Sequence, residues 1–73
     1  MVRDPQTDLL ERMRPIVVRN DRGMLPLIVS DWTHEFIVRG MSRVDIGLAI
    51  LDAFPYSDLA GEAGYSIIYA APS

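Results

Sequence analysis

Two apolar-rich segments meet at a three-residue joint, Gly40-Met41-Ser42, and this joint constrains the fold more than any other feature of the chain. Glycine is favoured directly after a helix end, because it has no Cβ and enters the left-handed backbone region without a clash. Ser42 followed by Asp45 resembles a capping box, in which two side chains satisfy backbone N–H groups at a helix start. The joint therefore predicts a helical hairpin over 26–54, in which one helix ends at Gly40 and the next starts at Ser42.

The segment before the joint allows two structures, and both place a turn at 19–23 in which Gly23 can accept a positive φ. In the first, Pro26 opens a helix over 26–39, because proline suits the first turn of a helix and fits poorly in a central strand. Such a helix places four large apolar residues on one stripe: Ile28, Trp32, Phe36 and Ile37. In the second, the β-branched residues on both sides of the turn form a β-hairpin over 16–29.

Before this segment, Asp4 and Pro5 predict the start of a helix over 5–14, with Asp4 as its cap. Pro15 interrupts or kinks that helix, because proline has no N–H to donate to the preceding turn. The sequence leaves the structure of 15–19 open.

After the joint, a helix is expected over 43–54, closed by Pro55. Ser57 can cap a short fourth helix over 58–64, and 65–71 then follows as an extended arm or a strand. The fold class is thus mainly α, a small single-domain bundle of three to four short helices over 1–73. The alternative is α+β, with the β-hairpin at 16–29.

Length and composition narrow the class of protein. A chain of 73 residues buries only about 60% of its unfolded surface, so its stability depends on unusually good packing or on oligomerisation. The chain has no Cys and one His, which excludes disulfides and thiolate metal sites. Its apolar runs are about six residues long, against the roughly 20 that span a bilayer, and the charged N-terminus is unlike a signal peptide. We expect a cytoplasmic protein without a membrane partner.

Charge is distributed unevenly along the chain. Residues 1–43 carry seven arginines and six acids, a net charge of +1, whereas 44–73 carry four acids and no base. The C-terminal part is therefore an acidic pole.

The residues around the joint, Arg39 to Ile46, resemble a helix-turn-helix, whose turn carries a glycine and whose second helix often begins with serine and a basic residue. The resemblance implies a dimeric DNA-binding transcriptional regulator and makes Arg39, Ser42 and Arg43 candidate nucleic-acid contacts. Phe36 departs from the pattern, because a small residue usually faces the second helix there.

Charge disfavours DNA binding by this helix. Asp45 and Asp52 outnumber Arg43 along it, whereas affinity for DNA rises with the number of phosphates that a protein neutralises. A DNA-binding function would need further basic contacts from the rest of the chain: Arg12, Arg14, Arg19, Arg22 and Arg39.

The helix over 43–54 is apolar on nearly every face, and such a helix must be buried on every face. A domain of this size has few elements to surround it, so one face is expected to meet another protein or a second copy of the chain. Gly47 would allow close backbone approach on one side. Tyrosines and acids of the C-terminal part would extend this surface. The predicted partner-binding residues are Val44, Leu48, Leu51, Tyr56, Asp58, Glu62, Tyr65 and Tyr69.

No other constellation points to chemistry. Asp31, His34 and Glu35 share a helix face, but a stable metal site would need a further ligand, and the chain has no second His and no Cys. The three are expected on a solvated polar face. No nucleophile elbow or phosphate-binding loop is present, so we expect no enzyme activity, no catalytic residue, no metal and no cofactor.

The function predicted from the sequence is that of a non-enzymatic regulatory or inhibitory protein that acts by binding a protein, with homodimerisation as one form of it. Small acidic domains without cysteine resemble, in size and character only, accessory inhibitors of phages and mobile elements, including anti-CRISPR proteins. The alternative is the dimeric helix-turn-helix regulator.

Overall fold

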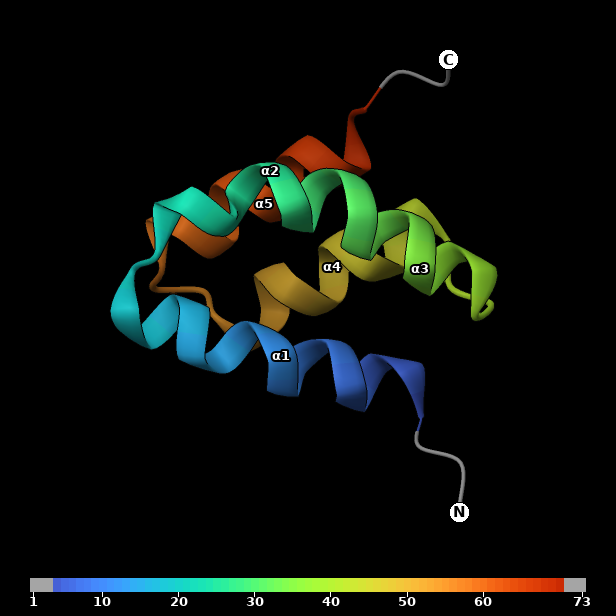
Figure 1. Ribbon diagram of the computed structural model, residues 1–73, viewed down its shortest axis with the longest axis horizontal. Helices are drawn as coiled ribbons and strands as arrows, with labels where there is room; N and C mark the ends of the chain where they lie inside the picture. Colours follow the sequence, from blue (N-terminus) through green and yellow to red (C-terminus); the bar gives the residue numbers. More distant parts are fainter. Residues whose placement is uncertain (1–3, 71–73) are drawn as a thin grey trace.

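The computed structural model describes residues 4–70 and folds them into helices joined by short turns (Figure 1). The elements are α1 (Pro5–Arg19), a 3-10 turn η1 (Arg22–Met24), α2 (Leu25–Leu27), a π turn η2 (Ile28–Trp32), α3 (Thr33–Val38), α4 (Arg43–Ala53) and α5 (Asp58–Ile68). The elements α2, η2 and α3 follow one another without a break and form one long helix over 25–38. Residues 4–70 contain no strand, so the mainly α prediction is confirmed and the β-hairpin at 16–29 is wrong.

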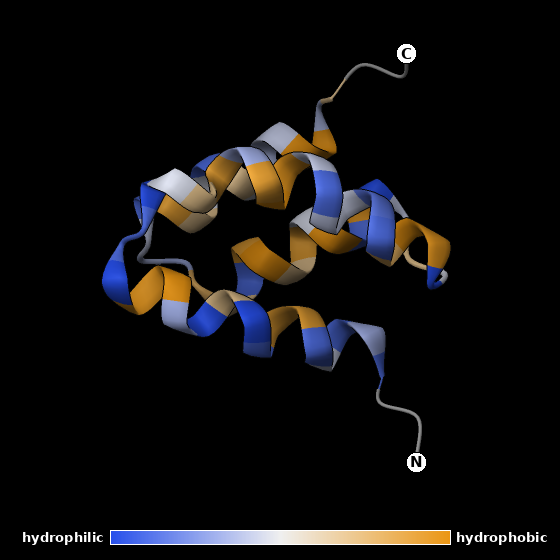
Figure 2. Cartoon of the chain, in the orientation of Figure 1, coloured by the Kyte–Doolittle hydropathy of each residue, from blue (hydrophilic) through white to orange (hydrophobic). Residues whose placement is uncertain are grey.

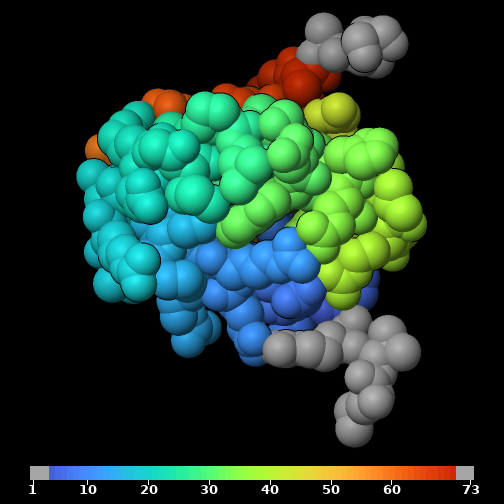
Figure 3. All heavy atoms as spheres, viewed as in Figure 1, coloured from blue at the N-terminus to red at the C-terminus, as the bar shows by residue number. Residues whose placement is uncertain are grey.

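In the view of Figure 1, α4 lies behind α1 and the long helix over 25–38, and α5 turns back along α4 after a short loop. The space-filling view shows α1 and the 22–38 segment covering one face of the molecule, with α5 visible only along the edge (Figure 3). The Cα radius of gyration is 11.2 Å, which matches the value of about 11 Å for a compact chain of this length.

The first helix begins as predicted and ends later than predicted. The Asp4 carboxylate accepts a hydrogen bond from the N–H of Thr7 at 3.2 Å, and Pro5 takes the first helical position. Pro15, expected to interrupt or kink the helix, lies inside it at an exposed position. The helix continues to Arg19 because Met13 and Ile16, on either side of Pro15, are both buried in the core.

The turn after α1 lies at 19–23 as predicted, but Gly23 does not supply the positive φ. Asn20 takes the left-handed conformation with φ of 52°, and its N–H donates to the carbonyl of Val17 at 3.1 Å. Asparagine tolerates this region better than most residues with a side chain.

The joint at Gly40-Met41-Ser42 is confirmed. Gly40 has a φ of +106°, which residues with a Cβ rarely adopt. The N–H of Asp45 donates to Ser42 Oγ at 3.0 Å, and the N–H of Ser42 donates back to Asp45 Oδ2 at 3.5 Å, which completes the capping box. These contacts end the helix over 25–38 and begin α4 with only residues 39–42 between them.

The π turn in the middle of the 25–38 helix changes which residues reach the core. Ile28, Thr33 and Phe36 are fully buried, whereas Trp32 is only partly buried and Ile37 is exposed, so the predicted apolar stripe is half wrong. A π turn adds a residue to the turn, and the buried position after Ile28 therefore moves from 32 to 33. The hydroxyl of Thr33 donates to the carbonyl of Ile28 at 2.9 Å, which satisfies this buried polar group.

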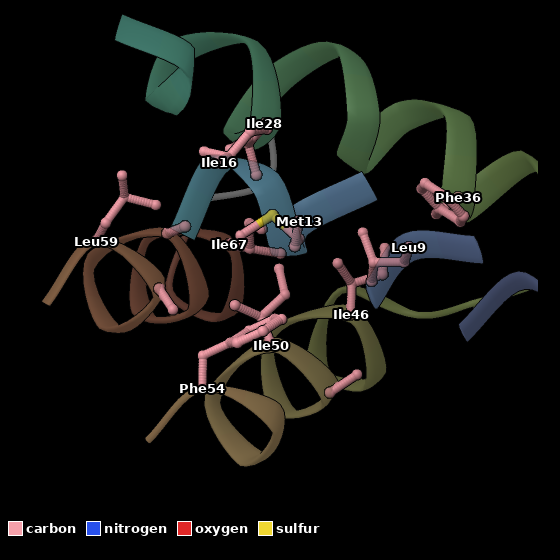
Figure 4. Packing of buried hydrophobic residues seen from close by; sticks show 13 residues of the cluster. Leu9, Met13, Ile16, Ile28, Phe36, Ile46, Ile50, Phe54, Leu59 and Ile67 are labelled. Carbon is pink, nitrogen blue, oxygen red and sulfur yellow. The ribbon is translucent and has the colours of Figure 1, made fainter. Parts of the chain in front are cut away.

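The core draws large apolar side chains from α1, the long helix over 25–38, α4 and α5, and they point toward one another (Figure 4). Burying each Leu, Ile, Met or Phe side chain is worth about 1.5–3 kcal/mol relative to leaving it exposed. The buried cluster comprises Leu9, Met13, Ile16, Ile28, Phe36, Ile46, Ala49, Ile50, Phe54, Leu59, Ala60, Ala63 and Ile67.

The last helix is longer than expected, because α5 continues through Ile68 instead of ending near residue 64. The arm or strand predicted over 65–71 is therefore wrong as far as Ile68, and residue 71 lies outside the described range. Ile67 is fully buried, and Ile68 packs against Gly47 of α4, so tertiary contacts hold the end of the helix in place.

Candidate protein-binding face

Three of the predicted partner-binding residues lie on one stripe of α4, because positions 44, 48 and 51 follow the helical repeat. Val44 and Leu48 are 50% and 49% exposed, and Leu51 is partly buried beside α5. Figure 2 shows the cause: α1 alternates between hydrophilic and hydrophobic residues, whereas hydrophobic residues make up most of α4. The core takes one side of α4 and leaves these apolar side chains uncovered.

The predicted residues of α5 form a second stripe, at positions 58, 62, 65 and 69. Tyr65 is 58% exposed and Tyr69 is 77% exposed. Their rings stack with centroids 6.3 Å apart and an interplanar angle of 15°. We name the two stripes together the α4–α5 face, which comprises Val44, Leu48, Leu51, Asp58, Glu62, Tyr65 and Tyr69.

Four of these seven residues line one open groove of about 410 Å³ at the C-terminal end of α4. Phe54 and Pro55 complete its apolar lining. The groove is lined mainly by Leu51, Phe54, Pro55, Asp58, Glu62 and Tyr65. Both charged residues among them are acids.

The other predicted partner-binding residues lie outside this groove. Tyr56, in the loop between α4 and α5, is 80% exposed and does not line it. Leu48 lines a second open depression of about 390 Å³, together with Asp45 and Asp52 of α4 and Asp4, the N-cap of α1. The α4–α5 face thus has acids on both of its sides.

One arginine reaches the groove from another part of the chain. Arg22 Nη2 of η1 donates to Glu62 Oε1 at 2.8 Å, and both side chains are about half exposed. The pair joins residues that are 40 positions apart in the sequence, so no local spacing could have revealed it.

A second ion-pair cluster, also missed from the sequence, ties α1 to α3. Arg12 donates two hydrogen bonds to the carboxylate of Glu35, at 2.9 and 2.6 Å, and Arg39 Nη1 lies 2.6 Å from Asp8 Oδ2. The hydrogen bonds with Arg12 hold the pKa of Glu35 below its ordinary value, and the same contacts raise the pKa of Arg12. The guanidinium of Arg12 also lies 5.1 Å from the ring centroid of Phe36. The spacing of Asp8 and Arg12 on one helix could have predicted an ion pair between them. No spacing in the sequence pointed to their partners in the other helix.

These ion pairs bear on the helix-turn-helix alternative. Arg12, Arg22 and Arg39 each face a carboxylate within the molecule, so three of the five arginines required for a DNA surface are already engaged. The hydroxyl of Ser42 accepts a hydrogen bond within the capping box. Of the three candidate nucleic-acid contacts, Arg43 therefore stands out, at the exposed start of α4.

The three polar residues that were expected together on one solvated face of the 25–38 helix have different surroundings in the structure. Glu35 is bound by Arg12, whereas Asp31 and His34 are exposed. Within residues 4–70, no group of three or more His, Cys, Asp or Glu side chains has the geometry to hold a metal ion. None of the helices over the same range has the length and apolar character to cross a bilayer.

Comparison of the chain with family models, with curated proteins and with solved structures gave no match.

Proposed function

We propose that this protein is a non-enzymatic regulatory or inhibitory module that binds another protein through the α4–α5 face. The observation that carries the proposal is the exposure of two large apolar side chains on α4, Val44 and Leu48, and of two tyrosines on the adjacent helix α5, Tyr65 and Tyr69. Contiguous apolar and aromatic side chains on the surface of a small domain are typical of protein interaction sites. Tyrosines are enriched at the centres of such sites, because they bury a large ring at low conformational cost.

The remainder of the molecule supports this proposal by providing a rigid base for the face. The α4 and α5 helices are fixed by the core side chains on their other sides, such as Ile46, Ile50 and Ile67. A preformed surface loses little conformational freedom on binding.

Site-specific photo-crosslinking in the cells that make the protein tests the proposal. A benzoylphenylalanine placed at Leu48 or Tyr65 is expected to give a discrete adduct of higher mass. The same probe at Val18, which is 78% exposed on α1, is the matched control and should give none. An adduct at twice the chain mass of 8.2 kDa would identify a second copy as the partner. The same adducts at all three positions, or none at either position on the face, would contradict the proposal.

DNA binding by a dimer remains the second candidate, supported by the Gly40–Ser42 joint and its capping box. A DNA-binding protein should bind duplex with an affinity that falls steeply as salt rises, and Arg43→Gln should weaken it. Duplex binding at low salt that is insensitive to this change would remove α4 as the recognition helix.

A further inference from the structure

The lining of the groove at the C-terminal end of α4 combines apolar and acidic side chains. Leu51, Phe54 and Tyr65 contribute apolar and aromatic surface, and Asp58 and Glu62 contribute the acids, which we call its acidic rim. We propose that this groove binds a basic amphipathic peptide segment of a partner protein, with an apolar side chain in the groove and Arg or Lys side chains against the two acids. The inference rests on the proposed function of the α4–α5 face and names the chemistry of its partner.

Charge complementarity favours this occupant over a second copy of the chain. Residues 44–70 carry four acids, Asp45, Asp52, Asp58 and Glu62, and no base. Two copies meeting through this face would bring their acidic rims together, and like charges across an interface oppose association. A basic segment instead gains long-range attraction as it approaches.

The contact of Arg22 with Glu62 shows how a cation can meet the groove. Its guanidinium reaches the rim from η1 and bonds one oxygen of the carboxylate, Oε1, at 2.8 Å. Both side chains are about half exposed, and an exposed pair of this kind contributes little to folding stability. A guanidinium or ammonium group of the partner can therefore replace Arg22, which competes with the partner for the same acid.

This competition provides a matched pair of variants. Glu62→Gln and Arg22→Gln break the same internal ion pair, so they affect the fold similarly. The first removes the acid that the partner would contact, whereas the second releases it. We expect Glu62→Gln to weaken peptide binding by about 2- to 5-fold and Arg22→Gln to strengthen it by a similar factor.

The probe is a display library of random peptides of about 16 residues, long enough for about four helical turns. The library is selected on the wild-type protein, and the recovered peptides are measured by fluorescence anisotropy at low and high salt. Recovered sequences should carry Arg or Lys around Leu, Phe or Trp, and their binding should weaken with salt. Tyr65→Ala should weaken it too, and circular dichroism checks that each variant is folded.

Several results would overturn the inference: an empty selection, peptides that are neutral or acidic, or equal effects of Glu62→Gln and Arg22→Gln. A wild-type dimer in sedimentation experiments that Tyr65→Ala converts to a monomer would do the same, because it would place the groove in the dimer interface. The two proposals fail separately. Crosslinks at Leu48 and Tyr65 together with non-basic peptides would preserve the α4–α5 face and remove the basic partner. The absence of both crosslinks and recovered peptides would remove both.

Discussion

At the residue scale, two glycines set the distance between α4 and α5. A Cβ added at Gly47 would lie 2.7 Å from the carbonyl oxygen of Gly64, and a Cβ at Gly64 would lie 2.7 Å from Leu51 Cγ. The close approach of the two helices therefore depends on the absence of a side chain at both positions. This approach also brings Leu51 and Tyr65 together in the lining of one groove.

We expect Gly47→Ala to lower the free energy of unfolding by about 1–3 kcal/mol, because the added methyl group overpacks a tight helix contact. Gly61→Ala on α5 is the control, since a Cβ there would meet no atom within 4 Å. This change should raise the free energy of unfolding by about 0.5–1 kcal/mol, because alanine loses less backbone freedom than glycine. Urea unfolding measures both, and equal values for the two variants would show that α4 and α5 are not in close contact.

At the scale of elements, the ion-pair cluster of Asp8, Arg12, Glu35 and Arg39 joins α1 to the helix over 25–38, and its two arginines lie over the buried ring of Phe36. The two hydrogen bonds from Arg12 to Glu35 give this contact a fixed geometry. The cluster orients the helix before the joint relative to the first helix of the chain.

The pKa of Glu35 predicts how stability depends on pH. Because this pKa is lower in the folded state, folding favours the charged form. The stabilisation is complete above the ordinary pKa of a glutamate and is lost as the pH falls through the folded value. We expect Glu35→Gln to lower the free energy of unfolding by about 0.5–1 kcal/mol at neutral pH, a small cost because the pair is partly exposed. The difference between variant and wild type should vanish in acid.

A double-mutant cycle with Arg12→Gln separates this interaction from other effects of the two changes. The coupling energy should disappear at low pH and shrink in high salt. A coupling energy that is zero at neutral pH, or that does not change with pH, would show that the Arg12–Glu35 contact does not stabilise the fold.

Much of the element structure was predictable because it depends on contacts within one helical turn. The cap at Asp4, the joint from Gly40 to Ser42 and the cap at Ser57 were all identified from residue type and spacing. The errors came where burial overrode local preference. Pro15 lies inside α1, and Thr33 is buried in the core where the sequence predicted Trp32. No residue type marks a π turn, so the sequence could not predict the shift of the buried position from 32 to 33.

At the scale of the whole molecule, we expect the acids around the α4–α5 face to oppose self-association. Asp52→Asn with Asp58→Asn should promote it, because the change removes like charge beside the exposed apolar residues. Asp21→Asn with Asp31→Asn is the control, since it changes net charge equally at exposed positions elsewhere. Sedimentation velocity is expected to show oligomers only for the first variant. Oligomers of the wild type, or of both variants equally, would contradict this role of the acids.

The exposure of Val44, Leu48, Tyr65 and Tyr69 was predictable from the sequence, but the arrangement of the candidate site was not. A helix over 43–54 that is apolar on nearly every face indicated that part of it stays uncovered, and the tyrosines were expected to be exposed. The groove depends on the loop after Phe54 and on the distance between two helices, which no spacing along the chain encodes. The contact of Arg22 with Glu62 depends on the path of the whole chain.

The sequence by itself determined the helical class, the joint and the acidic pole, because caps act within a turn and composition fixes charge. Tertiary structure decided the register of the 25–38 helix, the length of α5 and the pairing of the arginines. Those features depend on which surfaces meet, and burial of residues such as Thr33 and Ile67 outweighs local preference. Tertiary structure also left one side of α4 uncovered, and the proposed function rests on that side.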